Sequence, residues 1–111
     1  MMRSALITGL VLLGSAVDAQ EVPRAQLYGA VIDSLSGMPV YEALVEWYDP
    51  AGKRQAIVQT NSEGRFALFV PRDQGIELRV TENGYRPLVI EFPLFEPGES
   101  AREVDLKLVP K

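Results

Sequence analysis

The sequence predicts an all-β fold, a seven-stranded antiparallel sandwich of two sheets. From Leu27 onward, apolar residues recur at every second position, and clusters of Gly, Pro, Asn and Asp interrupt them at short intervals. No segment sustains the 3.6-residue period of an amphipathic helix. A single sheet of seven such strands would leave one apolar face in water, so two sheets packed face to face are expected.

Three strands are expected in the first half of the domain, at residues 26–33, 43–48 and 55–60. In the first strand the residues on both faces are rather apolar, which suggests a strand covered on both sides. In the second strand Trp47 points inward. The sequence DPAG at Asp49–Gly52 predicts a turn that joins the second strand to the third as a hairpin. Ala56, Val58 and Thr60 are expected to share one face.

Four further strands are expected at residues 65–70, 76–81, 88–92 and 104–108. Pro71 ends the first of these because proline cannot donate to a β-ladder. Turns are predicted at residues 61–64 and at Asn83 and Gly84. The inward positions of the last strand are Val104, Leu106 and Leu108.

The N-terminal segment, residues 1–19, has the pattern of an export signal. Arg3 supplies a positive charge, an apolar stretch follows, and cleavage is expected before Gln20. The alternatives are a short buried helix and a membrane anchor, but the apolar stretch is too short to span about 30 Å of hydrocarbon comfortably. Residues 20–25 then form a lead-in, and residues 26–111 form the single domain of an exported protein, either periplasmic or secreted.

Composition excludes several classes of chemistry. The chain contains no cysteine and no histidine, so it has no thiolate nucleophile, no disulfide, and neither the commonest general base nor the commonest transition-metal ligand. The formal net charge is −4 with the two signs interspersed, which does not favour nucleic-acid binding. We therefore assign no cofactor and no metal.

The order of several residues resembles the carboxypeptidase regulatory-like domains. The resemblance covers about residues 26–109 and is carried by Gly29, Val31, Asp33, Gly37, Pro39, Val40, Ala43 and Val45, then by Thr60, Asn61, Glu63, Gly64, Phe66, Leu68 and Pro71, and finally by Ile76, Leu78, Val80, Gly84 and Tyr85. It implies a transthyretin-like Greek-key sandwich, in agreement with the strand count. Such a resemblance identifies a fold strongly and a function weakly.

The most distinctive of these motif residues have structural explanations. Gly64 and Gly84 are expected to adopt positive φ in turns. Phe66 and Tyr85 are expected to plug the edge of the core, with the Tyr85 hydroxyl in water. Gly29, Asp33, Pro39 and Ala43 complete the structural set.

Catalysis finds little support in the remaining residues. Transthyretin-like relatives include a hydrolase of purine degradation and ring-cleaving dioxygenases, and these rely on histidines that this chain lacks. Ser34, Ser36, Ser62 and Ser100 have no partner that could accept a proton. Glu42, Glu46 and Asp49 are candidates for a carboxylate pair, and Asp33, Asn61 and Glu63 for a hard cation, although the spacing of a calcium loop is absent.

Three aromatic residues are the candidate binding surface. Tyr41, Tyr48 and Phe69 fall on outward or loop positions, where they would contact a sugar ring or a protein, or else form a second layer of packing. The leading hypothesis is a non-catalytic exported module that binds an envelope protein or glycan. The alternatives are a small carbohydrate-binding protein and a hydrolase that uses carboxylates alone. A flat, uncharged edge strand would favour binding by strand addition.

Overall fold

The computed structural model describes residues 24–92 and 94–111. The expected export segment, residues 1–19, and the first part of the lead-in lie outside these residues. The described part contains no helix of the length and apolar character that crossing a bilayer requires.

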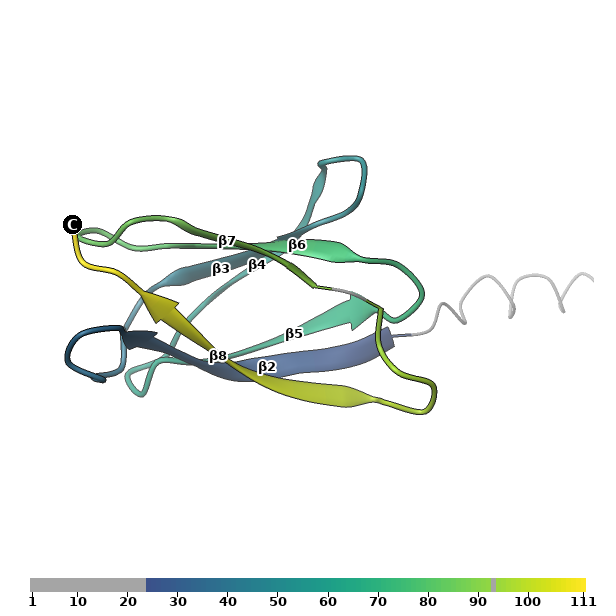
Figure 1. Cartoon of the computed structure of the whole chain (residues 1–111), viewed down its shortest axis with the longest axis horizontal. Coiled ribbons are helices and arrows are strands. Elements are labelled where there is room, and N and C mark those ends of the chain that lie inside the picture. The colour runs from purple at the N-terminus through teal and green to yellow at the C-terminus, as the bar shows by residue number, and fades with distance from the viewer. Residues whose placement is uncertain (1–23, 93) are drawn as a thin grey trace, which may run out of the picture.

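Seven strands form two sheets that pack face to face, as Figure 1 shows. One sheet has the order β5-β2-β8 and the other the order β4-β3-β6-β7. The strands are β2 (Arg24–Asp33), β3 (Leu44–Tyr48), β4 (Arg54–Gln59), β5 (Arg65–Pro71), β6 (Ile76–Thr81), β7 (Leu88–Phe92) and β8 (Ala101–Leu108). The expected all-β sandwich of seven strands is confirmed.

The expectation of a purely antiparallel sandwich is wrong for one pair. Strand β8 runs parallel to β2, with Gln26 beside Ala101 and Asp33 beside Leu108. The segment after β7 returns the chain to the end at which β2 begins, so both strands start at the same end (Figure 1). Alternation of side chains defines the faces of a strand but not its direction relative to a neighbour, so the sequence pattern could not reveal this pairing.

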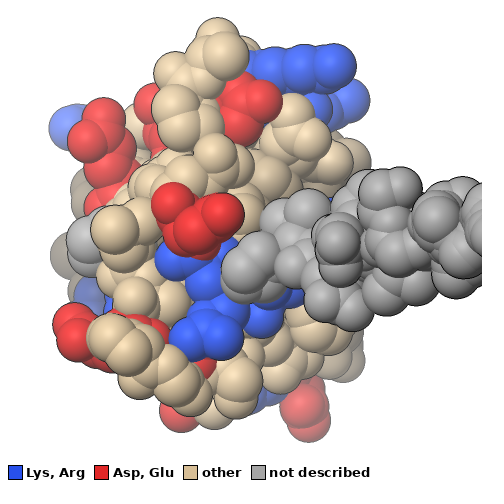
Figure 2. Space-filling view, turned by 90° about the vertical axis from the view of Figure 1, so that its right-hand side faces the viewer, with Lys and Arg blue, Asp and Glu red and all other residues tan. Residues whose placement is uncertain are grey.

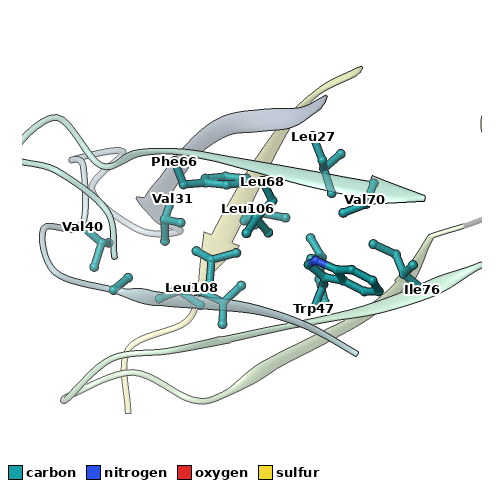
Figure 3. Close-up of a cluster of buried hydrophobic side chains, with 14 residues drawn as sticks. Leu27, Val31, Val40, Trp47, Phe66, Leu68, Val70, Ile76, Leu106 and Leu108 are labelled. Atoms are coloured by element: carbon teal, nitrogen blue, oxygen red, sulfur yellow. The ribbon is translucent and has the colours of Figure 1, made fainter. Parts of the chain in front are cut away.

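The core lies between the sheets and is built from the inward positions of the strands. In Figure 3, Leu27, Phe66, Leu68 and Val70 of one sheet face Trp47 and Ile76 of the other. Trp47 is 7% exposed, as expected for an inward residue. Strand β2 was expected to be covered on both faces. In the described residues its outer face is not fully covered, since the side chains of Tyr28, Ala30 and Ile32 remain partly exposed.

Candidate functional site

The three candidate aromatic residues do not share one surface. Tyr41 is 56% exposed in the turn before β3, and Phe69 is 61% exposed on the outer face of the β5-β2-β8 sheet. Tyr48 lies on the outer face of the other sheet, because its neighbour Trp47 points into the core. Since the outer faces of a sandwich point in opposite directions, Tyr48 and Phe69 cannot contact the same small ligand.

Tyr48 belongs to a polar network on the outer face of its sheet. The Arg79 guanidinium carbon lies 3.9 Å from the centre of the Tyr48 ring, and the Tyr48 hydroxyl donates to Glu46 Oε2 at 3.3 Å. Arg54 Nη1 donates to the same oxygen at 3.0 Å, and Arg79 forms an ion pair with Glu77. These contacts hold the Tyr48 ring in place at the rim of a hollow.

This end hollow has a volume of about 310 Å³ and lies beside the β3–β4 turn. Tyr48, Ile76 and Phe92 provide apolar walls, and Glu77 and Glu91 provide carboxylates. Glu77 and Glu91 are directly opposite each other on the antiparallel strands β6 and β7. Like charges in this position are destabilising, and here the ion pair of Glu77 with Arg79 offsets the repulsion. No sequence pattern pointed to this pair, because the pairing of β6 with β7 sets the two residues side by side.

The carboxylates selected from the sequence do not converge in this end hollow. Glu42 is in the turn before β3, with φ of 66°, and Glu46 is bound by Arg54. Asp49 borders the end hollow, but its Oδ1 accepts from the backbone N–H groups of Ala51 and Lys53 at 3.0 and 2.9 Å. The Asp49 carboxylate therefore shapes the β3–β4 turn.

Two of the three side chains considered for a cation, those of Asn61 and Asp33, accept local hydrogen bonds. Asn61 Oδ1 accepts from the backbone N–H groups of Glu63 and Arg65, both at 2.9 Å. Asp33 Oδ1 accepts from those of Leu35 and Ser36 at 2.8 and 2.9 Å. No cluster of three or more potential metal-ligating acidic residues occurs in residues 24–92 and 94–111.

The structure corrects one role expected for a motif residue. The Tyr85 hydroxyl, expected in water, donates to Asp33 Oδ2 at 2.8 Å. Gly64 and Gly84 have the expected positive φ, at 72° and 85°, and Phe66 is buried in the core.

The remaining motif residues hold loops and strands in place. Ala43 is fully buried, and Pro39 forms a bridge with Ile32. Gly29 faces the backbone of β8, where a Cβ atom would lie 1.6 Å from the carbonyl oxygen of Val104.

The end of the sandwich at which β2 begins has both basic and acidic side chains on its surface. Figure 2 shows basic side chains near the centre of this end, with acidic side chains around them. Here Arg102 Nη2 donates to Glu99 Oε1 at 2.7 Å, and its guanidinium lies over the Phe95 ring at 4.7 Å. Two hydrogen bonds lower the pKa of Glu99 to about 2: the larger effect comes from the Arg102 side chain and the smaller from the backbone N–H of Glu96.

A second hollow, the side hollow, lies where β4 and β5 diverge. It has a volume of about 440 Å³, and its lining includes Val58 and Gln59 of β4 and Arg65, Phe66 and Ala67 of β5. Both strands are edge strands of their sheets. Sequence reasoning did not find the side hollow because it depends on which strands lie at the edges.

No protein-family model matches the chain, and no curated protein matches its sequence. Solved structures share its fold. The 5-hydroxyisourate hydrolase of Klebsiella pneumoniae has a TM-score of 0.62 at 21% identity, covering 78% of this chain and 91% of that one. The fold is therefore transthyretin-like.

Two other similar structures are larger proteins. The 3-chlorocatechol 1,2-dioxygenase of Rhodococcus opacus has a TM-score of 0.64 at 13% identity over 85% of this chain, which spans 62% of the dioxygenase. The TIE protein of Bacillus anthracis has a TM-score of 0.67 at 17% identity over 79% of this chain and 17% of its own length. At these identities the comparisons establish the fold alone.

Proposed function

We propose that this chain is a non-catalytic, exported binding module of the carboxypeptidase regulatory-like type, and that it attaches to a protein of the cell envelope. The observation that carries the proposal is the open side of the sandwich, where the side hollow adjoins the unpaired edge of β5. An open strand edge beside apolar surface favours association with another polypeptide.

The chemistry of the side chains supports a binding role over a catalytic one. The fold neighbours include a hydrolase and dioxygenases, but this chain has no histidine and no cysteine. Glu46 and Asp49 are engaged by Arg54 and by backbone N–H groups. Two of the three carboxylates selected from the sequence are thus used in holding the fold.

The first test is cross-linking of the tagged protein in its own cells, followed by mass spectrometry of what is attached. One reproducible envelope protein is the expected result, and the mature chain recovered from the envelope or the medium should begin at Gln20. Recovery of the uncleaved chain from the cytoplasm would contradict export. Failure to capture any protein would contradict the proposed attachment.

Glycan binding is a second candidate, favoured by the end hollow. There the Tyr48 ring and the Glu91 carboxylate combine an aromatic surface with a hydrogen-bond acceptor, and sites for small ligands commonly join apolar walls to a few polar groups. Binding of soluble glycans that Glu91→Gln abolishes, and that Phe69→Ala on the opposite face leaves unchanged, would support this function. Release of new reducing ends by the wild-type protein, lost in Glu91→Gln, would instead indicate a carboxylate hydrolase.

A further inference from the structure

Among the edge strands, β5 combines an uncharged interior with regular pairing, whereas β4, which is equally uncharged between Gln55 and Gln59, has a register shift in its pairing with β3. The edges of the two sheets are β5 and β8 in one and β4 and β7 in the other. Between Phe66 and Val70, β5 has no charged residue, whereas β8 has four: Arg102, Glu103, Asp105 and Lys107. The pairing of β5 with β2 is also regular along its whole length. Charges and bulges are the devices that protect sheet edges from pairing, and the interior of β5 has neither.

The free backbone groups of β5 can be assigned from the register. The Val31 N–H donates to the Gly64 carbonyl at 2.8 Å, and antiparallel ladders alternate between bonded and non-bonded pairs. The pairs of Phe66 with Gly29 and of Leu68 with Leu27 are therefore bonded pairs. The N–H and C=O groups of Ala67 and Phe69 point away from β2, toward the open edge.

The space beside this edge has a mixed lining, in which Val58, Phe66 and Ala67 are apolar and Gln59, Asn61 and Arg65 are polar or charged. The inward residues Ala56 and Val58 of β4 are only partly buried, although they pack against the core. A strand added to β5 would lie opposite β4, about 10 Å away across the core, because four strands face three. Its inward side chains would enter the side hollow and cover Val58 and Phe66, which line it.

The chemistry of this edge specifies its occupant. Backbone groups exposed at alternate residues pair with an extended polypeptide, and the side hollow accepts apolar side chains at every second position. Arg65 is the only charged residue that lines the side hollow, and its Nη2 atom lies 3.8 Å from Glu103 Oε2 of β8, so the side hollow presents no unmatched charge to the added strand.

We infer that β5 binds an extended segment of the protein partner as a fourth strand of the β5-β2-β8 sheet, with alternate apolar side chains of that segment filling the side hollow. The inference rests on the proposed attachment to an envelope protein and adds the mode of binding. The outward position of Phe69, which is 61% exposed, places an aromatic ring beside the outward residues of the added strand.

Proline at position 67 is the direct probe. Ala67→Pro removes a backbone N–H that faces the open edge, so no bond to β2 is lost. Ala101→Pro is the matched control, because Ala101 begins β8 at the opposite edge of the same sheet. The Gln26 N–H donates to the Ser100 carbonyl, so by alternation the N–H of Ala101 also faces away from β2. Retention of the buried Trp47 emission verifies that each variant is folded.

The ligand probe is a phage library of random peptides about as long as β5, selected on the purified wild-type domain. Enriched peptides are expected to have apolar residues at alternate positions. Their affinity should fall about tenfold for Ala67→Pro, which corresponds to the loss of one hydrogen bond, and should remain unchanged for Ala101→Pro. A selection that enriches no peptides, or peptides that bind both variants equally, would overturn the inference.

A cross-linking experiment in cells separates failure of the binding mode from failure of the proposed function. The chain has no cysteine, so Ser36→Cys, at an exposed position of the β2–β3 loop outside β5, provides a single site for a photo-cross-linker and leaves the sequence of β5 unchanged. Capture that Ala67→Pro abolishes and Ala101→Pro preserves supports strand addition. An envelope protein captured equally by both variants retains the proposed function and excludes the β5 edge. If none of the three proteins (Ser36→Cys alone, or combined with Ala67→Pro or with Ala101→Pro) captures a partner, both the strand addition and the proposed attachment are contradicted.

Discussion

The Tyr85 hydroxyl donates a hydrogen bond of 2.8 Å to Oδ2 of Asp33, across 52 positions of sequence. Asp33 ends β2 in one sheet, and Tyr85 follows β6 in the other, so this bond joins the two sheets at one end of the sandwich. The same carboxylate holds the β2–β3 loop through Leu35 and Ser36. A residue expected to contribute mainly bulk therefore contributes a specific polar contact.

Replacing Tyr85 by Phe should lower stability in a pH-dependent manner. Hydrogen bonds from the Ser36 N–H and then from the Tyr85 hydroxyl lower the pKa of Asp33 below 3.8, and the bond to Asp33 raises the pKa of Tyr85 above 10.0. The extra stability of the wild type over Tyr85→Phe should be largest at pH values between the ordinary pKa values of the two groups, 3.8 and 10.0. It should decrease as pH falls through the lowered pKa of Asp33 and as pH rises through the raised pKa of Tyr85.

Urea unfolding of both proteins across this pH range, followed by Trp47 emission, measures that advantage. Equal stability of wild type and Tyr85→Phe at every pH would show that the bond between Tyr85 and Asp33 contributes nothing to folding.

Gly29→Ala should destabilise the domain by at least about 3 kcal/mol. A Cβ atom at this position would lie 1.6 Å from the carbonyl oxygen of Val104, so the parallel strands β2 and β8 would have to separate. Gly37→Ala is the control: its φ is 74° and its surroundings are open, so only backbone strain of about 1 kcal/mol applies. Similar losses for both variants in thermal unfolding would refute the close approach of β8.

Thr60→Val should cost about 2 to 4 kcal/mol because it leaves two buried backbone groups unpaired. Thr60 Oγ1 donates to the Val40 carbonyl at 2.7 Å and accepts from the Ala43 N–H at 2.9 Å. The side chain thereby clamps the turn that presents Tyr41. Thr60→Ser keeps the hydroxyl and should lose only about 1 kcal/mol for a methyl group. Denaturant unfolding should find the wild type most stable, then Thr60→Ser, then Thr60→Val. Equal losses of stability for the two variants would argue against the clamp.

Glu99→Gln should reduce stability at neutral pH and have little effect in strong acid. Arg102 and the Glu96 N–H lower the pKa of Glu99 from 4.5 to about 2. A carboxyl group with a lowered pKa contributes stability above its unfolded value, and loses that contribution as pH falls through its folded value. The difference in Tm between wild type and Glu99→Gln should therefore shrink between these two pH values. A difference that persists unchanged below about pH 2 would point to packing of Arg102 on Phe95 as its cause.

The strands were predictable because alternation is a local property of the chain. The strands at Ile76–Thr81 and Leu88–Phe92 lie where the pattern placed them. The end strands are longer than expected: β2 begins at Arg24 and β8 at Ala101. Their extra residues are extended because β2 pairs with both neighbours, Arg24 with Pro71 and Gln26 with Ala101.

The candidate surfaces were predictable only in part. The outward positions of Tyr48 and Phe69 followed from alternation, but their separation onto opposite faces followed from which strand joins which sheet. The same assembly brings Glu77 beside Glu91 and leaves β5 at an edge. None of these relationships connects residues close in sequence.

The sequence by itself determined the all-β class, the number of strands, their inward faces and the absence of histidine and cysteine chemistry. The tertiary structure alone decided the parallel pairing of β2 with β8, the bond between Asp33 and Tyr85, and the open side between β4 and β5. The physical reason is that each strand has its own alternation of apolar and polar residues. The hydrogen bonds between strands, in contrast, form between backbone groups that are the same in almost every residue. The choice of neighbours is therefore made by the packing of the whole core.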